Sequence, residues 1–214
     1  MQAIVYNTYL FDFDGTLIDS MPTYTELMLR ILDEEGIERP QGVVKIITPL
    51  GYGGTADYYI SLGARSSRED LLGRMHAYAY DEYAYRIPLK DGVEESLREL
   101  KKRGASLNIL TASPHRVLDV ALKRLGIFDL FDNVWSCDDF STTKSDPEIY
   151  IMAARRLGLA PNEYVFIDDN LNAVRTARAA GIPTLGIYDD SSAEYEDEIR
   201  AAADGYLMAL GDLL

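Results

Sequence analysis

The stretch that decides the fold is Tyr6-Asn7-Thr8-Tyr9-Leu10-Phe11-Asp12-Phe13-Asp14-Gly15-Thr16-Leu17, near the start of the chain. Its aromatic and aliphatic first half is typical of a buried strand, and Asp14-Gly15 supplies a turn that ends it. Asp12 and Asp14 are two residues apart, so on an extended chain their carboxylates point to the same side. Two ionised carboxylates placed together repel each other unless a cation lies between them. The stretch therefore predicts a strand end that binds a metal ion.

A plain turn and a calcium loop are the two alternatives for this stretch. Asp and Gly also form ordinary turns, which leaves a purely structural turn open on this motif alone. An EF-hand loop requires a bidentate Glu at its last position, and Ile18-Asp19-Ser20-Met21 supplies none. The calcium-loop alternative is therefore excluded.

Short apolar runs and helical patterns alternate over the second half of the chain. Three more strands are predicted, at Ser106–Leu110, Tyr164–Ile167 and Thr184–Tyr188. The helices expected between them are Val93–Arg103, Pro114–Leu125 with Ser113 as N-cap, one opening at Asp146-Pro147, and Leu171–Ala180. Alternation of this kind predicts an α/β protein, with a Rossmann-like parallel sheet and helices on both faces.

The segment after the first strand breaks this alternation. It predicts helices at Thr23–Glu35, Thr55–Leu62 and Ser67–Tyr85, with a glycine-rich loop, Gly51-Tyr52-Gly53-Gly54, before the second. We expect residues 18–87 to form an inserted helical domain, and residues 1–17 and 88–214 to form the α/β core. The loop is expected to place Tyr52 over the mouth of the site when the inserted domain closes.

Composition restricts the class of protein. At 214 residues the chain fits one domain, or one domain with an insertion, and 47% hydrophobic with 26% charged residues excludes a disordered chain. A net charge of −14 argues against nucleic acid and anionic membranes as partners. The apolar runs are too short to span a bilayer, the first residues do not resemble a secretory signal, and the single Cys137 fits a reducing compartment. We therefore expect a cytoplasmic protein.

Three further motifs fall at or beyond predicted strand ends. Thr111, with the backbone amides of Ala112 and Ser113, could cradle an anion. Lys144 precedes a predicted helix, where a solvated surface lysine is the more common case. Asp168-Asp169 follows another buried strand, and carboxylate oxygens there, opposite Asp12, are what Mg²⁺ requires. The coincidence of these motifs favours one shared site.

The order and spacing of the four motifs resemble those of the haloacid dehalogenase superfamily of hydrolases: Asp12 to Ser20, Thr111, Lys144 and Asp168-Asp169. The resemblance extends from about Tyr6 to the C-terminus and includes an inserted helical cap. Within the superfamily the chain looks most like the phosphoglycolate phosphatase and β-phosphoglucomutase group, because Pro88–Val93 and Ala179–Pro183 are similar to that group's re-entry and closing segments.

The resemblance implies a Mg²⁺-dependent phosphatase that acts on a small phosphorylated metabolite. Asp12 would be the nucleophile and Asp14 the general acid and base. Mg²⁺ would be held by Asp12, by the backbone carbonyl of Asp14 and by Asp169, with Asp168 acting directly or through water. The expected phosphate- and substrate-binding residues are Gly15, Thr111, Ala112, Lys144, Tyr52 and His115.

Several alternatives stay open at this stage. A phosphomutase of the same group commonly has a basic residue soon after the second motif, where this chain has His115 and Arg116. A dehalogenase is disfavoured because such relatives lack the carboxylate that Asp14 supplies, and a non-catalytic module that binds Mg²⁺ and phosphate is a further possibility. Asn172 stands near a position where many of these phosphatases have another aspartate, and it could orient Lys144 or Asp168 instead. We expect a monomer or a weak homodimer.

Overall fold

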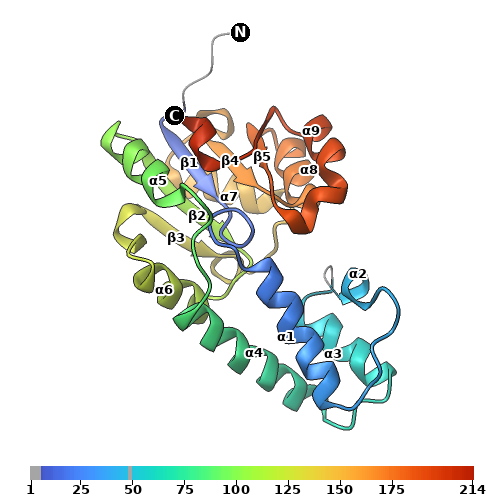
Figure 1. The fold of residues 1–214 in the computed structure, drawn as a ribbon. Coiled ribbons are helices and arrows are strands. Elements are labelled where there is room, and N and C mark those ends of the chain that lie inside the picture. The colour runs from blue at the N-terminus through green and yellow to red at the C-terminus, as the bar shows by residue number, and fades with distance from the viewer. Residues whose placement is uncertain (1–5, 48–49) are drawn as a thin grey trace. The chain divides into compact units, whose positions relative to one another are not determined.

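The computed structural model describes residues 6–47 and 50–214, and its centre is a parallel sheet. The six strands lie in the order β3-β2-β1-β4-β5-β6, so the first strand of the chain is central (Figure 1). Their bounds are β1 Thr8–Phe11, β2 Ser106–Thr111, β3 Asn133–Ser136, β4 Val165–Asp168, β5 Thr184–Ile187 and β6 Gly205–Leu207. This sheet confirms the predicted parallel α/β architecture.

The chain divides into two compact units. The sheet unit takes Met1–Asp19 and Pro88–Leu214, and the helical unit takes Ser20–Ile87. The sheet unit contains α5 Val93–Lys102, α6 His115–Arg124, α7 Glu148–Leu157, α8 Leu171–Ala179 and α9 Glu196–Ala202. The helical unit contains α1 Met21–Glu34, α2 Val43–Ile47, α3 Gly51–Ser61 and α4 Arg68–Tyr85.

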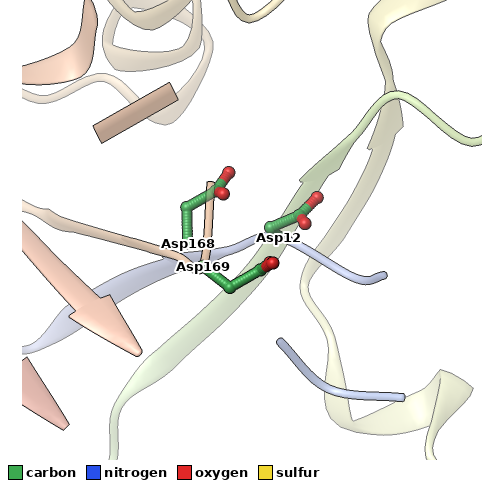
Figure 2. A group of neighbouring side chains, drawn as sticks. All are labelled: Asp12, Asp168 and Asp169. Carbon is green, nitrogen blue, oxygen red and sulfur yellow. The ribbon is translucent and has the colours of Figure 1, made fainter. Parts of the chain in front are cut away.

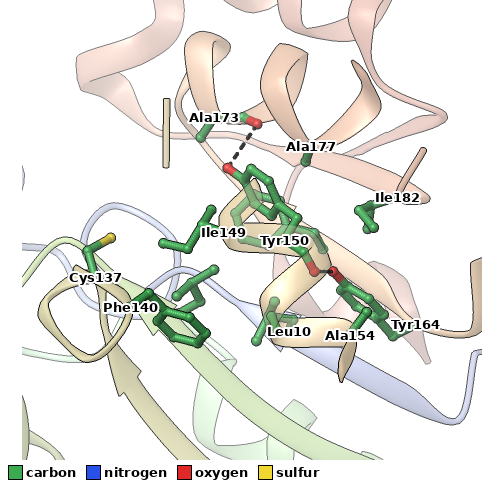
Figure 3. Close-up of a cluster of buried hydrophobic side chains, with 13 residues drawn as sticks. Leu10, Cys137, Phe140, Ile149, Tyr150, Ala154, Tyr164, Ala173, Ala177 and Ile182 are labelled. Carbon is green, nitrogen blue, oxygen red and sulfur yellow. Dashed lines mark hydrogen bonds between the residues drawn. The ribbon is translucent and has the colours of Figure 1, made fainter. Parts of the chain in front are cut away.

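Buried strand residues alternate between the two faces of the sheet. Leu10, Leu110 and Phe166 lie in one cluster with side chains of α7 and α8 (Figure 3). Their neighbours in the strands, such as Phe11 and Ile109, are also fully buried and point the other way. Burial on both faces explains why these strands are short continuous apolar runs, as expected for a parallel sheet covered by helices.

Within the helical unit, α4 contacts both α1 and α3. Buried positions recur three or four residues apart along α1, at Leu27, Met28, Ile31 and Leu32, which is the periodicity of one helix face. Ser67 is the N-cap of α4, and its side chain accepts a hydrogen bond from the Asp70 N–H, within one residue of the predicted start. In the part of the chain that the structure describes, no helix has the length and apolarity needed to cross a bilayer.

Two local predictions are wrong. Gly51-Tyr52-Gly53-Gly54 is not a loop but the first turn of α3, where burial of Thr55, Ala56 and Tyr59 offsets the roughly 1 kcal/mol that each glycine costs a helix. Ser113 is not the N-cap of α6, because Pro114 takes that position and no side chain caps the helix. The strands β3 and β6 have no counterpart among the predicted elements.

Candidate active site

Three buried aspartates meet where β1 and β4 end. Asp12 follows β1, while Asp168 ends β4 and Asp169 comes directly after it. Each offers one carboxylate oxygen such that all three oxygens lie within 4.8 Å of one another (Figure 2). The three residues are at most 6% exposed. The predicted convergence of these carboxylates is therefore present in the fold.

The register of the sheet brings the aspartates together. Phe11 pairs with Ile167 between the parallel strands β1 and β4, which places Asp12 and Asp168 side by side one residue later. The Asp12 N–H donates to the Ile167 carbonyl at 2.9 Å and continues the ladder to the strand end. Because β1 and β4 are adjacent although far apart in sequence, neither motif builds the cluster alone.

Lys144 is the cation of this cluster. Its Nζ lies 2.6 Å from Asp12 Oδ1 and 2.8 Å from Asp168 Oδ2, and its side chain is only 14% exposed. Burial alone would lower the pKa of Lys144, but the charges of Asp12 and Asp168 outweigh it, so the pKa lies well above its ordinary value. The predicted surface alternative for Lys144 is thus wrong, since this lysine is a buried ammonium between two carboxylates.

One lysine does not neutralise three carboxylates. Burial raises the pKa of Asp12 to about 7, helped by the charges of Asp168 and Asp14 and opposed by Lys144. Burial, followed by the charges of Asp168 and Asp12, holds the pKa of Asp169 well above its ordinary value. Burial and, after it, the neighbouring carboxylates thus both favour uptake of positive charge at this cluster, as a proton or a cation.

The donor set fits a hard divalent cation. Asp12 Oδ1 is buried and forms an ion pair with Lys144, yet it accepts no well-directed hydrogen bond from the described residues. Mg²⁺ prefers oxygen ligands and usually keeps several waters, so a few carboxylates are sufficient. Asp12, Asp168 and Asp169 could therefore hold Mg²⁺, and the predicted contribution of the Asp14 backbone carbonyl stays a prediction.

Gly15 and Thr16 shape the loop against Asp169. Gly15 has φ +78°, and a Cβ atom on it would lie 2.8 Å from the Asp169 carboxylate. Only glycine fits there, since other residues rarely adopt this φ and the space is already filled. Thr16 Oγ1 donates to Asp169 Oδ1 at 3.3 Å. Both residues thus fix the position of a candidate metal ligand.

The second motif forms a small hydrogen-bonded turn. Thr111, the last residue of β2, is buried, and its Oγ1 accepts a hydrogen bond from the Ser113 N–H at 3.0 Å. Ser113 Oγ in turn donates to Asp14 Oδ2 at 2.6 Å. Ala112 lies exposed between them. The fold thus brings Asp14, Thr111 and Ser113 together, and Ser113 is a contact that the sequence did not predict.

The two remaining predicted residues, His115 and Tyr52, each have contacts within their own unit. His115 lies with Nδ1 2.9 Å from Asp119 and Nε2 2.8 Å from Asp139, which argues against the predicted substrate contact. The hydrogen bond with Asp119, together with Asp139, raises the pKa of His115. Tyr52 belongs to the helical unit, where its ring stacks on Tyr24.

Asn172 does not perform the orienting role that the sequence suggested. It is exposed, and Asp168 Oδ1 instead accepts a hydrogen bond from the Asn170 N–H at 2.7 Å. The Asn170 side chain also caps α8 by accepting from Asn172 N and Ala173 N. Asp168 is therefore held by the backbone of Asn170 in addition to Lys144.

Sequence reasoning also missed Lys90. Its Nζ donates to the carbonyls of Gly15 and Tyr188, at 2.7 and 2.6 Å, and to Asp189 Oδ2 at 3.0 Å. Gly15 lies beyond β1 and Tyr188 beyond β5, and these strands flank β4. Lys90 thus ties together the loops on either side of the Asp168-Asp169 pair. A lone lysine beside Asp91-Gly92 gave no signal of this.

Comparisons with known proteins agree with the geometry. The profile of the family described as haloacid dehalogenase-like hydrolase matches residues 6–181. Pyrophosphatase PpaX of Bacillus velezensis is 31% identical over 83% of this chain and 81% of that protein. Phosphoglycolate phosphatase of Pseudomonas putida is 29% identical over 83% of this chain and 68% of that protein.

Solved structures share the fold. CbbY of Rhodobacter sphaeroides in complex with phosphate superposes with a TM-score of 0.80, covering 97% of this chain and 96% of that chain at 21% identity. At this identity the likeness concerns the fold alone. With carboxylate motifs at the ends of β1 and β4 and a family profile over most of its length, this chain belongs to the haloacid dehalogenase-like hydrolases.

Proposed function

We propose that the protein is a Mg²⁺-dependent phosphatase that hydrolyses a small phosphate monoester through an aspartyl-phosphate on Asp12. The observation that carries the proposal is the meeting of Asp12, Asp168 and Asp169 around one point, with Lys144 against Asp12 and Asp14 two residues further on. The named phosphatases among the relatives support the same reaction class.

In the first half-reaction, a carboxylate oxygen of Asp12 attacks phosphorus as the bond to the leaving oxygen breaks. The leaving alcohol takes a proton from Asp14, and Asp12 becomes an acyl phosphate. In the second half-reaction, water attacks this phosphorus and gives a proton to Asp14. Phosphate leaves, and the Asp12 carboxylate is restored. Covalent catalysis thus divides one difficult displacement into two easier ones.

The attack brings an anionic nucleophile to an anionic phosphate, so positive charge must be present at the start. When bound, Mg²⁺ supplies charge that orients the phosphate and reduces this repulsion. Lys144 supplies a fixed ammonium beside Asp12. The Thr111 hydroxyl accepts from Ser113 N–H, which leaves its own hydrogen to donate to a phosphate oxygen. One such donor is worth about 2.7–4 kcal/mol in the transition state.

The choice between reactions rests on Asp14. Halide leaves without a proton, whereas an alcohol requires one, and a carboxyl at this position favours phosphate esters over dehalogenation. A phosphomutase remains the second candidate because its core would be the same. We favour hydrolysis, since Asp119 and Asp139 engage His115, one of the two basic residues, with Arg116, that follow the second motif. We assign substrate specificity to the helical unit, and Tyr52 is its candidate substrate contact.

The test is phosphate release from a panel of phosphorylated metabolites with Mg²⁺. The panel includes phosphoglycolate, sugar phosphates, nucleotides and pyrophosphate. We expect Asp12→Asn to lower release by more than about a thousandfold, and the exposed Asp129→Asn, with the same charge change, to leave it unaltered. Activity that survives in Asp12→Asn contradicts the nucleophile, and isomer formation faster than phosphate release identifies a mutase.

A further inference from the structure

The hydrogen bond between Ser113 and Asp14 joins the two predicted chemical centres of the site. Ser113 Oγ lies 2.6 Å from Asp14 Oδ2, which is the length of a strong hydrogen bond to a carboxylate. The two residues are 99 positions apart in sequence and come from the loops that follow β1 and β2. This contact therefore exists only because these strands are neighbours.

Each partner in this bond has a fixed backbone. On the β1 side, Gly15 N–H donates to Ile18 O and Leu17 N–H donates to Phe13 O, so the turn that holds Asp14 is closed. On the β2 side, Ser113 N–H donates to Thr111 Oγ1. Pro114 follows, and the residue before a proline is restricted to extended conformations. The contact therefore joins two backbone segments that are each held by hydrogen bonds of their own.

The Asp14 carboxylate has an electrostatic reason to rotate away. Asp14 is two residues from Asp12, a member of the acidic cluster, and its charge is among the causes that raise the pKa of Asp12. A carboxylate beside like charges is pushed toward solvent. The Ser113 hydroxyl opposes this, and it can do so because it does not cap α6.

We propose that Ser113 is a positioning residue that holds the Asp14 carboxyl in the conformer from which it exchanges protons with the leaving alcohol and the attacking water. This rests on the proposed function, in which Asp14 is the general acid and base. Ser113 then matters only to steps that move a proton. The consequence is a dependence on the leaving group, since an alcohol needs the proton and nitrophenolate leaves without it.

The experiment compares the full chain with Ser113→Ala and Ser113→Thr, using Mg²⁺ and two substrates: an alkyl phosphate from the panel and p-nitrophenyl phosphate. Ser113→Ala should lower kcat on the alkyl phosphate by about tenfold to a hundredfold. With p-nitrophenyl phosphate the first turnover should stay near the parent rate. Because the acyl phosphate is then hydrolysed slowly, Ser113→Ala should release a burst of one nitrophenolate per enzyme. Ser113→Thr keeps the hydroxyl and should restore both kcat on the alkyl phosphate and the rate of acyl-phosphate hydrolysis.

Ser96→Ala is the matched control, because it removes another 2.6 Å hydroxyl bond in the sheet unit, to the Gly92 carbonyl. Ser96→Ala should leave the ratio of the turnover rates on the two substrates unchanged. Equal losses in the first-turnover rate on both substrates, or no loss of rate on the alkyl phosphate, overturn the proposal. Crystal structures give a readout besides activity: Asp14 should keep one conformer in the parent and in Ser113→Thr and leave it in Ser113→Ala. If the parent hydrolyses neither substrate, the phosphatase proposal fails, and the Asp14 conformers still decide the role of Ser113.

Discussion

Gly15 packs closely against the Asp169 carboxylate, so a substitution at this single residue tests whether Asp169 binds the metal. In Gly15→Ala the new Cβ would lie 2.8 Å from the Asp169 carboxylate, which must move. We expect Mg²⁺ affinity to fall by more than about tenfold, a loss of about 1.4 kcal/mol of binding free energy. Titration calorimetry measures this without any substrate.

Gly126→Ala is the control for Gly15→Ala. Gly126 has a similar φ of +70°, and a Cβ atom there would meet nothing within 4 Å. Both variants have the backbone cost of a non-glycine residue at positive φ, about 1–2 kcal/mol. Mg²⁺ affinity should drop only in Gly15→Ala, and an equal drop in both variants would show that general destabilisation is the cause.

Single residues also show how far the sequence predicts the site. Asp12, Asp168 and Asp169 could be found because each ends an apolar run, and strand ends of a parallel sheet meet at one edge. Ser113 and Lys90 could not, since their partners Asp14 and Gly15 are 99 and 75 positions away. Ser113 also fitted a helix cap by its local sequence, and tertiary contacts decided otherwise.

At the scale of elements, α7 connects Lys144 to the core through one side chain. Tyr150 in α7 is fully buried, and its hydroxyl lies 3.2 Å from the Ala173 carbonyl (Figure 3) and 3.0 Å from the Lys144 carbonyl. We expect Tyr150→Phe to lower stability by about 1–2 kcal/mol. It should also lower kcat by about threefold to tenfold, because the backbone that bears Lys144 loses its anchor.

Tyr164→Phe is the control for Tyr150→Phe. The Tyr164 hydroxyl is also buried, and it donates to the Tyr150 carbonyl at 2.9 Å, away from Lys144. The two variants should melt at similar temperatures while only Tyr150→Phe loses activity. Equal kcat values in both would mean that Lys144 is held in place without Tyr150.

In the helical unit, Glu35 connects the end of α1 to the start of α4. This buried carboxylate accepts hydrogen bonds from Arg65 N and from Ser66 N and Oγ, and it forms an ion pair with Arg74. Burial raises its pKa, but these bonds outweigh burial and lower the pKa from 4.5 to about 2. The ionised form is therefore the one that stabilises the fold.

The sign of this shift fixes the pH window. Because the folded pKa of Glu35 lies below the unfolded value, its contribution is complete above about pH 4.5 and is lost as the pH falls toward 2. Glu35→Gln should lower stability by about 2 kcal/mol at pH 7 and by much less at pH 3. Hydrogen exchange of the α1 and α4 backbone amides measures this loss of stability at each pH. The exposed Glu38→Gln is the control. A Glu35→Gln effect that does not depend on pH would contradict the assignment.

Elements differ in how well the sequence predicts them. The central strands β1, β2 and β4 are apolar on both faces and are predictable, whereas β3 contains partly exposed residues and β6 has only three residues. These outer strands form because the neighbouring strand supplies backbone hydrogen-bond partners. No local sequence pattern encodes this pairing. The glycines of α3 predict a loop, yet they form a helical turn, because burial within the helical unit overrides their low helix propensity.

At the scale of the whole molecule, the net charge of −14 makes a bound cation a matter of stability as well as catalysis. The acidic cluster concentrates three of these carboxylates in a buried site, with Lys144 as its ammonium. Binding that occurs only in the folded state stabilises it by about 2.7 kcal/mol when the ligand is a hundred times above its Kd. For a chain of this length that corresponds to a rise in Tm of about 5–10 °C.

The pH dependence of this rise follows from the raised pKa values of Asp12 and Asp169. Burial raises the pKa of Asp12 to about 7, so without Mg²⁺ the folded state holds a proton that the unfolded state has lost. This contribution favours folding at low pH and disappears as the pH rises from about 4 through 7. The Tm measured in EDTA should therefore fall between pH 5.5 and 8, a window well above that of Glu35.

Bound Mg²⁺ requires the carboxylates in their ionised form, so its binding releases protons and strengthens as the pH rises. The difference in Tm between Mg²⁺ and EDTA should accordingly widen from pH 5.5 to 8, and calorimetry in buffers of different ionisation enthalpy should detect the released protons. Asp169→Asn should remove most of the difference, while the exposed Asp129→Asn should leave it intact. A gap that is the same at every pH would mean that Mg²⁺ binds away from these aspartates, and the cluster would then lose its assignment as the metal site.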